Sequence, residues 1–116
     1  MPRQKNQITY AHAAPAAVEE AVSRVGRQIA VARLRRGWRQ VDLAEKAGIT
    51  RATLVGIEQG KLGTGFGAYV AVLWALGLED AVAQLAAPEN DAEGLTLEAA
   101  RLGTRARRPP KLDDDF

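Results

Sequence analysis

A glycine at position 48 divides the stretch from Gln40 to Lys61 into two short segments, and this division constrains the fold more than any other feature. Glycine readily adopts the left-handed conformation that often ends a helix. The hydroxyl of Thr50 can accept a backbone N–H from the first turn of the next helix, a contribution of about 1 kcal/mol. The apolar residues recur at helical spacing on each side of the glycine, so two short helices joined by a tight turn are predicted. These residues are Leu43, Ala44 and Ala47 before it and Leu54, Val55 and Ile57 after it.

The second predicted helix, Arg51–Gln59, has the length and position of a helix that reads DNA. A short helix of this kind fits a major groove about 12 Å wide. Arg51 and Ala52 stand at its start, where side chains reach base edges, and an arginine can form a two-pronged bond with guanine. Gly56, one turn later, is expected to offer a bare surface that lets the helix approach the bases.

Other polar residues around this helix suit the phosphates, which position a protein on DNA without reading its sequence. For the charged residues among them, an ordinary solvent-exposed charge is the alternative interpretation. The predicted phosphate contacts are Arg39, Gln40, Thr53 and Lys61.

Charge is distributed unevenly along the chain, although the formal net charge is only +2. Residues 1–61 contain eleven Lys or Arg and five Asp or Glu, whereas residues 62–100 contain six acidic residues and no Lys or Arg. Residues 101–116 contain five basic residues and then Asp113–Asp115. A polyanionic partner is therefore expected to meet the first half of the chain.

The sequence predicts an all-α domain over residues 15–87, with a flexible arm at residues 1–14 and a tail at residues 88–116. Pro15 suits the first residue of a helix that runs to Gly37. The apolar stripe of this helix is longer than the two-helix motif needs. Its first turns would therefore pack either on a second subunit or on the chain's own last helix. The stripe consists of Val18, Val22, Val25, Ile29 and Ala32.

Two further helices, Ala68–Leu76 and Glu79–Ala86, are predicted on either side of Gly77. Trp74 lies off the main apolar face of the first, so we expect it to join Val82 and Leu85 in an interface with a second copy or another protein. Partial burial of Trp74 within the chain is the alternative.

The glycine-rich run at residues 62–67 is too rich in glycine for regular helix and is expected to be a loop that crosses the DNA backbone. It does not match a nucleotide-binding loop, because no strand precedes it and the Lys-Ser/Thr pair of such loops is missing. After Pro88, apolar residues are few, so the tail is expected to be disordered or to dock as an added helix around Leu95–Leu102.

Composition argues against an enzyme and against export. The chain has no cysteine for a disulfide or thiolate site, and its single histidine lies in the predicted arm. Its apolar runs are shorter than the ~18 residues of a membrane span. Asp113–Asp115 are expected to be solvated rather than to bind a metal. We therefore expect a protein without catalytic residues, metal or cofactor, located in the cytoplasm and associated with the nucleoid when bound to DNA.

Over residues 25–86, the order and spacing of many residues resemble the Xre/Cro helix-turn-helix family. This resemblance implies a five-helix, lambda-repressor-like domain that binds double-stranded operator DNA as a homodimer. It also implies a structural ion pair between Arg33 and Glu58. The resemblance is carried by Leu34, Gly37, Gln40, Leu43–Ala44, Ala47–Thr50, Thr53, Ile57–Glu58, Gly60 and Ala75–Leu78.

The glycine-rich loop, Trp74 and the final Lys111–Phe116 are similar to HipB-type antitoxins, which are encoded beside HipA-like kinase toxins. The similarity implies a transcriptional repressor that is also the autoregulating antitoxin of a HipA-like toxin. The sequence departs from the wider family at the glycine-rich loop, where an Asn-Pro-Ser type of turn is usual, and at Gly56. A helical protein-interaction module that neutralises a toxin, with weak or no specific DNA binding, is the alternative function.

Overall fold

The computed structural model describes residues 15–105, which form helices and turns without any strand. The predicted all-α class is therefore confirmed for this part of the chain. The chain divides into two compact units, Met1–Val82 and Ala83–Phe116. The predicted limit between domain and tail near residue 87 stays a prediction. The predicted arm and the last eleven residues of the predicted tail lie outside the described residues. None of the described helices is long and apolar enough to cross a membrane.

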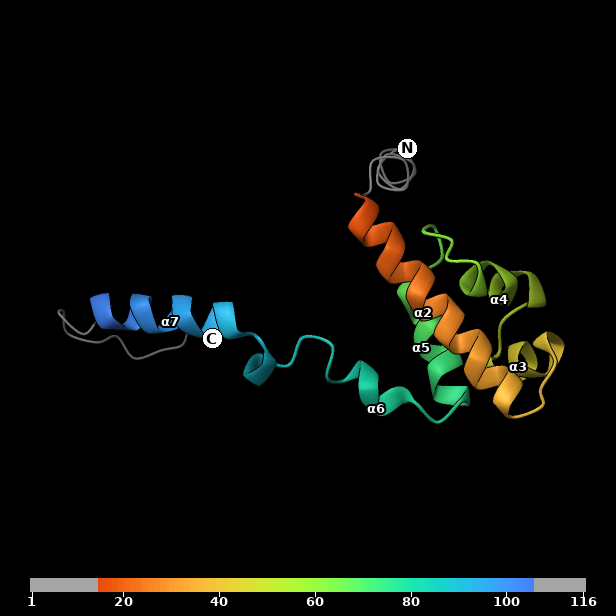
Figure 1. Ribbon diagram of the computed structural model, residues 1–116. Coiled ribbons are helices and arrows are strands. Elements are labelled where there is room, and N and C mark those ends of the chain that lie inside the picture. Colours follow the sequence, from red (N-terminus) through yellow and green to blue (C-terminus); the bar gives the residue numbers. More distant parts are fainter. Residues whose placement is uncertain (1–14, 106–116) are drawn as a thin grey trace, which may run out of the picture. The chain divides into compact units, whose positions relative to one another are not determined.

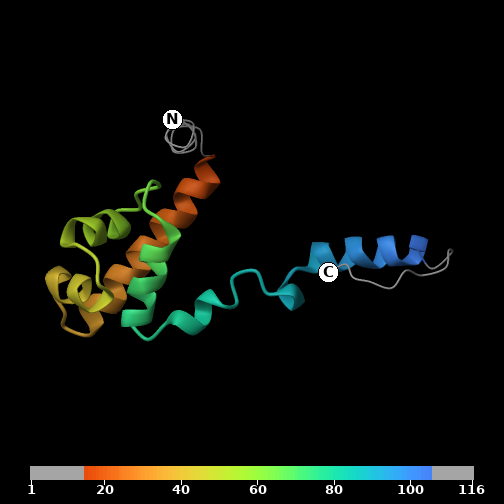
Figure 2. The same cartoon turned by 180° about the vertical axis from the view of Figure 1, so that it is seen from behind.

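The first unit is built around a long helix, α2, against which the shorter helices are arranged (Figure 1). Both α3 and α4 lie beside α2, and α5 lies behind it in Figure 1 and in front of it in Figure 2. The helices of this unit are α2 (Ala16–Arg35), α3 (Gln40–Ala47), α4 (Arg51–Glu58), α5 (Phe66–Ala75) and the short α6 (Glu79–Val82).

Four of these helices contribute aliphatic side chains to a single core, which fixes their relative positions. Complete burial of such a side chain stabilises the fold by about 1.5–3 kcal/mol. Half-buried residues, Val22 and Val25 among them, pack around this centre. The largest fully buried side chains are Ile29 of α2, Leu43 of α3, Leu54 and Ile57 of α4, and Val72 of α5.

The turn between α3 and α4 has the geometry that the sequence predicts. Gly48 has a φ of 74°, in the left-handed region, and the N–H of Ile49 donates to the carbonyl of Ala44 at 3.0 Å. The Thr50 hydroxyl oxygen accepts a hydrogen bond from the N–H of Thr53 at 3.1 Å. The turn is therefore specified by residues within a few positions of one another.

Trp38, in the link between α2 and α3, is half-buried and packs against the core. Two cations cover its ring: the Lys46 ammonium lies 4.7 Å from the ring centroid, and the Arg36 guanidinium lies 5.9 Å away. Arg36 also donates to the carbonyl of Leu76 at 2.9 Å. This bond joins the end of α2 to the end of α5.

The predicted limits of the last two helices of the first unit need correction. Helix α5 starts at Phe66 rather than Ala68, so Phe66 and Gly67 are helical although they belong to the glycine-rich run. Gly65 occupies the N-cap position, where glycine is among the favoured residues, so the helix begins directly after it. Helix α6 ends at Val82 rather than Ala86. Leu85 is 68% exposed, so no burial holds the following residues in a helix.

The described part of the second unit consists of a single 3-10 turn, Pro88–Asn90, and helix α7, Ala92–Arg105. Helix α7 is longer than the predicted Leu95–Leu102. The Asp91 carboxylate begins it by accepting the N–H of Gly94 at 3.0 Å. Leucines along α7 are about half exposed or more, so the helix has little buried surface within its own unit.

Close packing of α2 on α4 depends on two glycines. Gly26 is buried in α2, and a Cβ at this position would collide with the carbonyl oxygen of Ile57. Gly60, just after α4, has a φ of 79° and lies against Ser23. The sequence predicts that the first turns of α2, around Val18 and Val22, pack on a second subunit or on the chain's own last helix. Val22 is half-buried and packs instead against the core of the first unit.

We predict that Gly26→Ala lowers the free energy of unfolding by about 1–3 kcal/mol, because α2 must move away from the Ile57 carbonyl. Urea denaturation followed by circular dichroism measures this change. Gly63→Ala is the matched control, since a Cβ at Gly63 meets nothing within 4 Å. An equal effect of both substitutions would contradict the close α2–α4 contact as the cause.

Candidate nucleic-acid interface

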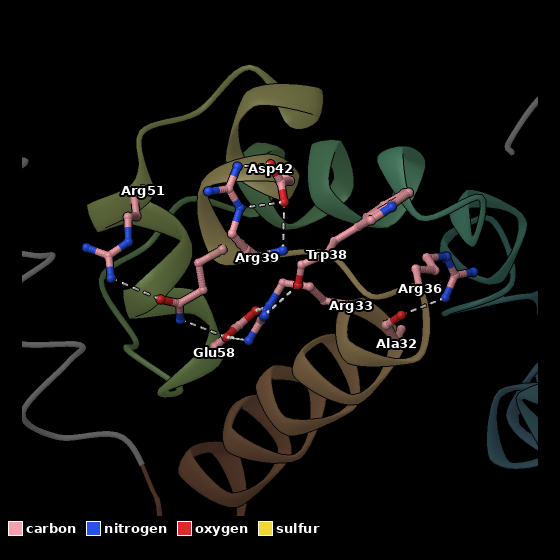
Figure 3. Close-up of polar contacts among 9 residues, drawn as sticks. Ala32, Arg33, Arg36, Trp38, Arg39, Asp42, Arg51 and Glu58 are labelled. Atoms are coloured by element: carbon pink, nitrogen blue, oxygen red, sulfur yellow. Dashed lines mark hydrogen bonds and ion pairs between the residues drawn. The ribbon is translucent and has the colours of Figure 1, made fainter.

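The ion pair between Arg33 of α2 and Glu58 of α4 is present and nearly buried (Figure 3). Arg33 Nε lies 2.7 Å from Glu58 Oε2, and Arg33 Nη2 lies 3.1 Å from Glu58 Oε1. The remaining terminal nitrogen, Nη1, donates to the carbonyl oxygen of Trp38 at 2.9 Å. The pair therefore links α2, the chain segment before α3, and the end of α4.

Gln40 extends this network from the core to the surface. Its side-chain nitrogen donates to Glu58 Oε1 at 3.0 Å, and its side-chain oxygen lies 3.4 Å from Nη2 of Arg51. Arg51 is exposed at the start of α4. The structure thus brings the predicted base-reading residue Arg51 beside the predicted phosphate contact Gln40. The amide of Gln40 is directed at Glu58 and Arg51, and its contact with phosphate stays a prediction.

Arg39, a predicted phosphate contact, is exposed at the start of α3 and pairs with Asp42. Its Nε and Nη2 lie 3.1 and 3.0 Å from the two carboxylate oxygens, and Asp42 also accepts the backbone N–H of Arg39 at 2.8 Å. These hydrogen bonds lower the pKa of Asp42 and raise the pKa of Arg39. A phosphate bound by Arg39 would therefore also lie close to the negatively charged Asp42 carboxylate.

An open groove of about 790 Å³ separates α4 from the loop that follows it. Four of the predicted DNA-contacting residues line this groove and are thus brought together: Ala52, Thr53, Gly56 and Lys61. The N–H of Lys61 donates to the carbonyl of Gly56 at 2.9 Å. The hydroxyl of Tyr69, whose pKa is raised by burial, donates to the carbonyl of Lys61 at 3.4 Å. The backbone of Lys61 is thus held in place beside the groove.

Gly56 does not form the bare, exposed surface that the sequence suggested. It is buried, and a Cβ there would lie 3.2 Å from Cδ of Lys61 and 3.8 Å from the Thr64 hydroxyl oxygen. The missing side chain therefore makes room for the loop that packs back on α4. The bond from the Lys61 N–H to the Gly56 carbonyl closes the end of α4 across the left-handed Gly60, and it brings Lys61 back over Gly56.

Sequence reasoning missed two residues of this region. Asp42 binds Arg39, and its signal was available, because an acidic side chain at the third position of a helix commonly accepts the N–H of the residue before the helix. Thr64 lines the groove with Lys61, and no pattern in the glycine-rich run distinguishes it.

The residues predicted for a protein interface are distributed over both units. Trp74 lies on α5 and is 60% exposed, and Val82 is half-buried at the end of α6. Leu85 belongs to the second unit. An interface that joins Trp74, Val82 and Leu85 therefore stays a prediction.

The tight turn at Gly48, the exposed start of α4 and the core that holds α3 against α4 are the features of a helix-turn-helix motif. A family model described as a helix-turn-helix domain matches residues 24–86, more than half of the chain. The chain belongs to the helix-turn-helix domain family. The match includes α3, α4, α5 and most of α2, and it extends beyond α6 into the start of the second unit. No curated protein and no solved structure gave a match to this helix-turn-helix chain.

Glu58→Gln is expected to lower the free energy of unfolding by about 3–5 kcal/mol, because it leaves the Arg33 charge buried without an opposite charge. Urea denaturation measures the loss. The double substitution Arg33→Met with Glu58→Leu should cost less than Glu58→Gln alone, since no buried charge then remains.

Glu20→Gln is the control for the loss of a carboxylate. Glu20 is 56% exposed and pairs with Arg24 and Arg27 on α2. Exposed pairs of this kind contribute less than about 1 kcal/mol. A similar cost for Glu20→Gln and Glu58→Gln would show that burial gives the Arg33–Glu58 pair no special role.

Proposed function

We propose that this helix-turn-helix protein is a sequence-specific transcriptional regulator, a repressor that binds double-stranded operator DNA as a homodimer. The observation that carries the proposal is the placement of Arg51, exposed at the start of α4 and within 3.4 Å of Gln40. Through Gln40, Arg51 is connected to the buried Arg33–Glu58 pair. A preorganised arginine loses less side-chain freedom when it binds a base edge.

In this proposal, the start of α4 enters the major groove and Arg51 forms a two-pronged bond with guanine. Arg39, Thr53 and Lys61 stand around it and contact phosphates. Ala52 adds only a small apolar contact, and Gly56 is covered by the loop. Discrimination between sequences therefore depends on Arg51, on DNA shape and on the spacing of two half-sites about 34 Å apart.

The first test uses a duplex chosen by repeated selection of tight-binding sequences from a random library. Arg51→Ala should weaken binding to that duplex by about 1–3 kcal/mol and leave binding to random-sequence DNA nearly unchanged. Fluorescence anisotropy titrations measure both affinities. Arg24→Ala, which removes another exposed arginine, is the control and should have the same small effect on both duplexes. An equal loss on both duplexes for Arg51→Ala would mean that Arg51 contacts only phosphate.

We further propose that the protein is the autoregulating antitoxin of a HipA-like kinase toxin. Support comes from the similarity of its loop, Trp74 and C-terminal residues to HipB-type antitoxins, and from the separation of a basic first half from an acidic stretch at residues 62–100. Two differently charged regions suit two unlike partners, DNA and a protein. Such a regulator acts in the cytoplasm, on the nucleoid when bound to DNA.

The antitoxin proposal predicts that a HipA-like kinase encoded by the neighbouring gene co-purifies with this chain. Removal of residues 88–116, which include α7, should abolish the complex and leave DNA binding intact. Tagged co-expression followed by size-exclusion chromatography measures both species. A complex that persists at equal yield without residues 88–116 would contradict the role of this segment. Absence of a complex with the full chain would contradict the antitoxin role itself.

A helical interaction module without specific DNA binding is the competing function, and the exposed apolar side chains of α5 favour it. Salt dependence separates the two functions. A regulator that contacts several phosphates loses affinity steeply as salt rises, because bound DNA releases counterions. A flat response in the same anisotropy titrations, or no binding at low salt, would favour the interaction module.

A further inference from the structure

Helix α5 has no charged side chain, and one of its faces is not covered by the rest of the first unit. Its ten residues are Phe-Gly-Ala-Tyr-Val-Ala-Val-Leu-Trp-Ala. Val72 faces the core. Successive residues of a helix are rotated by about 100° around its axis, so Val70 and Trp74, two positions before and after Val72, lie on the opposite face. Phe66 is 62% exposed and Trp74 is 60% exposed. A helix that is apolar on all sides normally has neighbours on all sides.

We propose that two copies of this chain pair through the α5 face formed by Phe66, Val70 and Trp74, with the two α5 helices packed across a two-fold axis. This inference names the surface of the homodimer and therefore rests on the proposed function. The face carries no charge, so two identical copies meet without like-charge repulsion, and an uncharged apolar face is complementary to its own copy, as a two-fold interface requires. A basic or acidic partner would find no complementary charge on this face.

The position of α5 suits a dimer that reads DNA. Helix α5 contacts α3 and α4 through its core side, and no helix of residues 15–82 covers it on the side nearest the viewer in Figure 2. Packed helices lie about 8–10 Å apart. In such a dimer the helices follow in the order α4 and α5 of one copy, then α5 and α4 of the second. Three spacings therefore separate the two α4 helices by roughly 24–30 Å. This separation is close to the ~34 Å between half-sites one DNA turn apart.

The size of the α5 face determines how strong the pairing is. With about 200 Å² for each aromatic side chain, the exposed parts of Phe66 and Trp74 come to roughly 250 Å². A stable interface buries about 800 Å² on each partner. The α5 face alone therefore supports a weak dimer, and two half-sites on one duplex strengthen it by holding both copies close together.

Sedimentation equilibrium of the full chain up to millimolar concentration tests the pairing in solution. The unsubstituted chain should show reversible monomer–dimer exchange, and Trp74→Glu should weaken dimerisation about tenfold or more, since it places a charge in the pair. Leu34→Glu is the matched control, because Leu34 lies on α2 and is 63% exposed. It should leave the dimer unchanged.

Cross-linking gives a second measurement that does not depend on a destabilising charge. The chain has no cysteine, so a single introduced thiol forms a disulfide only with another copy. Val70→Cys should cross-link on mild oxidation, and faster with a duplex of two selected half-sites than with one half-site. Val31→Cys, on the exposed side of α2, is the control and should not cross-link specifically.

Equal dimerisation of Trp74→Glu and Leu34→Glu, or equal cross-linking of Val70→Cys and Val31→Cys, would overturn the inference. An unsubstituted chain that stays monomeric at every concentration and on the two-half-site duplex would overturn it as well. Failure of the proposed function gives a different result: the dimer is lost in Trp74→Glu, but no duplex is selected by the unsubstituted chain. Selected DNA that is bound identically by Trp74→Glu would leave the function standing and refute the α5 interface.

Discussion

The nearly buried ion pair between Arg33 and Glu58 connects the parts of the first unit that must keep their relative positions. Arg33 comes from the long helix α2, and Glu58 from the end of α4. Arg33 also donates to the Trp38 carbonyl, and Glu58 accepts from Gln40. Two charges taken out of water are tolerated because each is bonded by the other and by a further polar group. The start of α3 and the end of α4 are thereby held against α2.

This network also links the core to the surface that we assign to DNA. Gln40 is the intermediate residue, with its nitrogen on Glu58 and its oxygen near Arg51. Gly26 and Gly60 let α2 approach the end of α4 closely, so Glu58 reaches Arg33. Helix α5 carries an uncharged face. The unit thus offers a polar surface at the start of α4 and an apolar surface on α5, which suit partners of different chemistry.

Much of the motif could be predicted from the sequence, because its determinants are local. Gly48 ends α3 and Thr50 begins α4 through contacts within a few residues, and both were identified correctly. Helix limits were predicted less well than these caps. Helix α5 starts earlier than its glycines suggested, and α6 ends earlier than its composition suggested. The Arg33–Glu58 pair was expected only through family resemblance, since spacing does not show that positions 25 residues apart meet.

The sequence by itself determined the helix-turn-helix motif, its all-α setting and the exposed Arg51 at the start of α4. Caps, turns and apolar periodicity depend on neighbouring residues, so they can be recognised without a fold. Only the tertiary structure decided that Gln40 connects Arg51 to Glu58. It also decided that one face of α5 has no neighbour in the first unit. These outcomes depend on which elements pack together, and that packing is set by contacts between residues far apart in the chain.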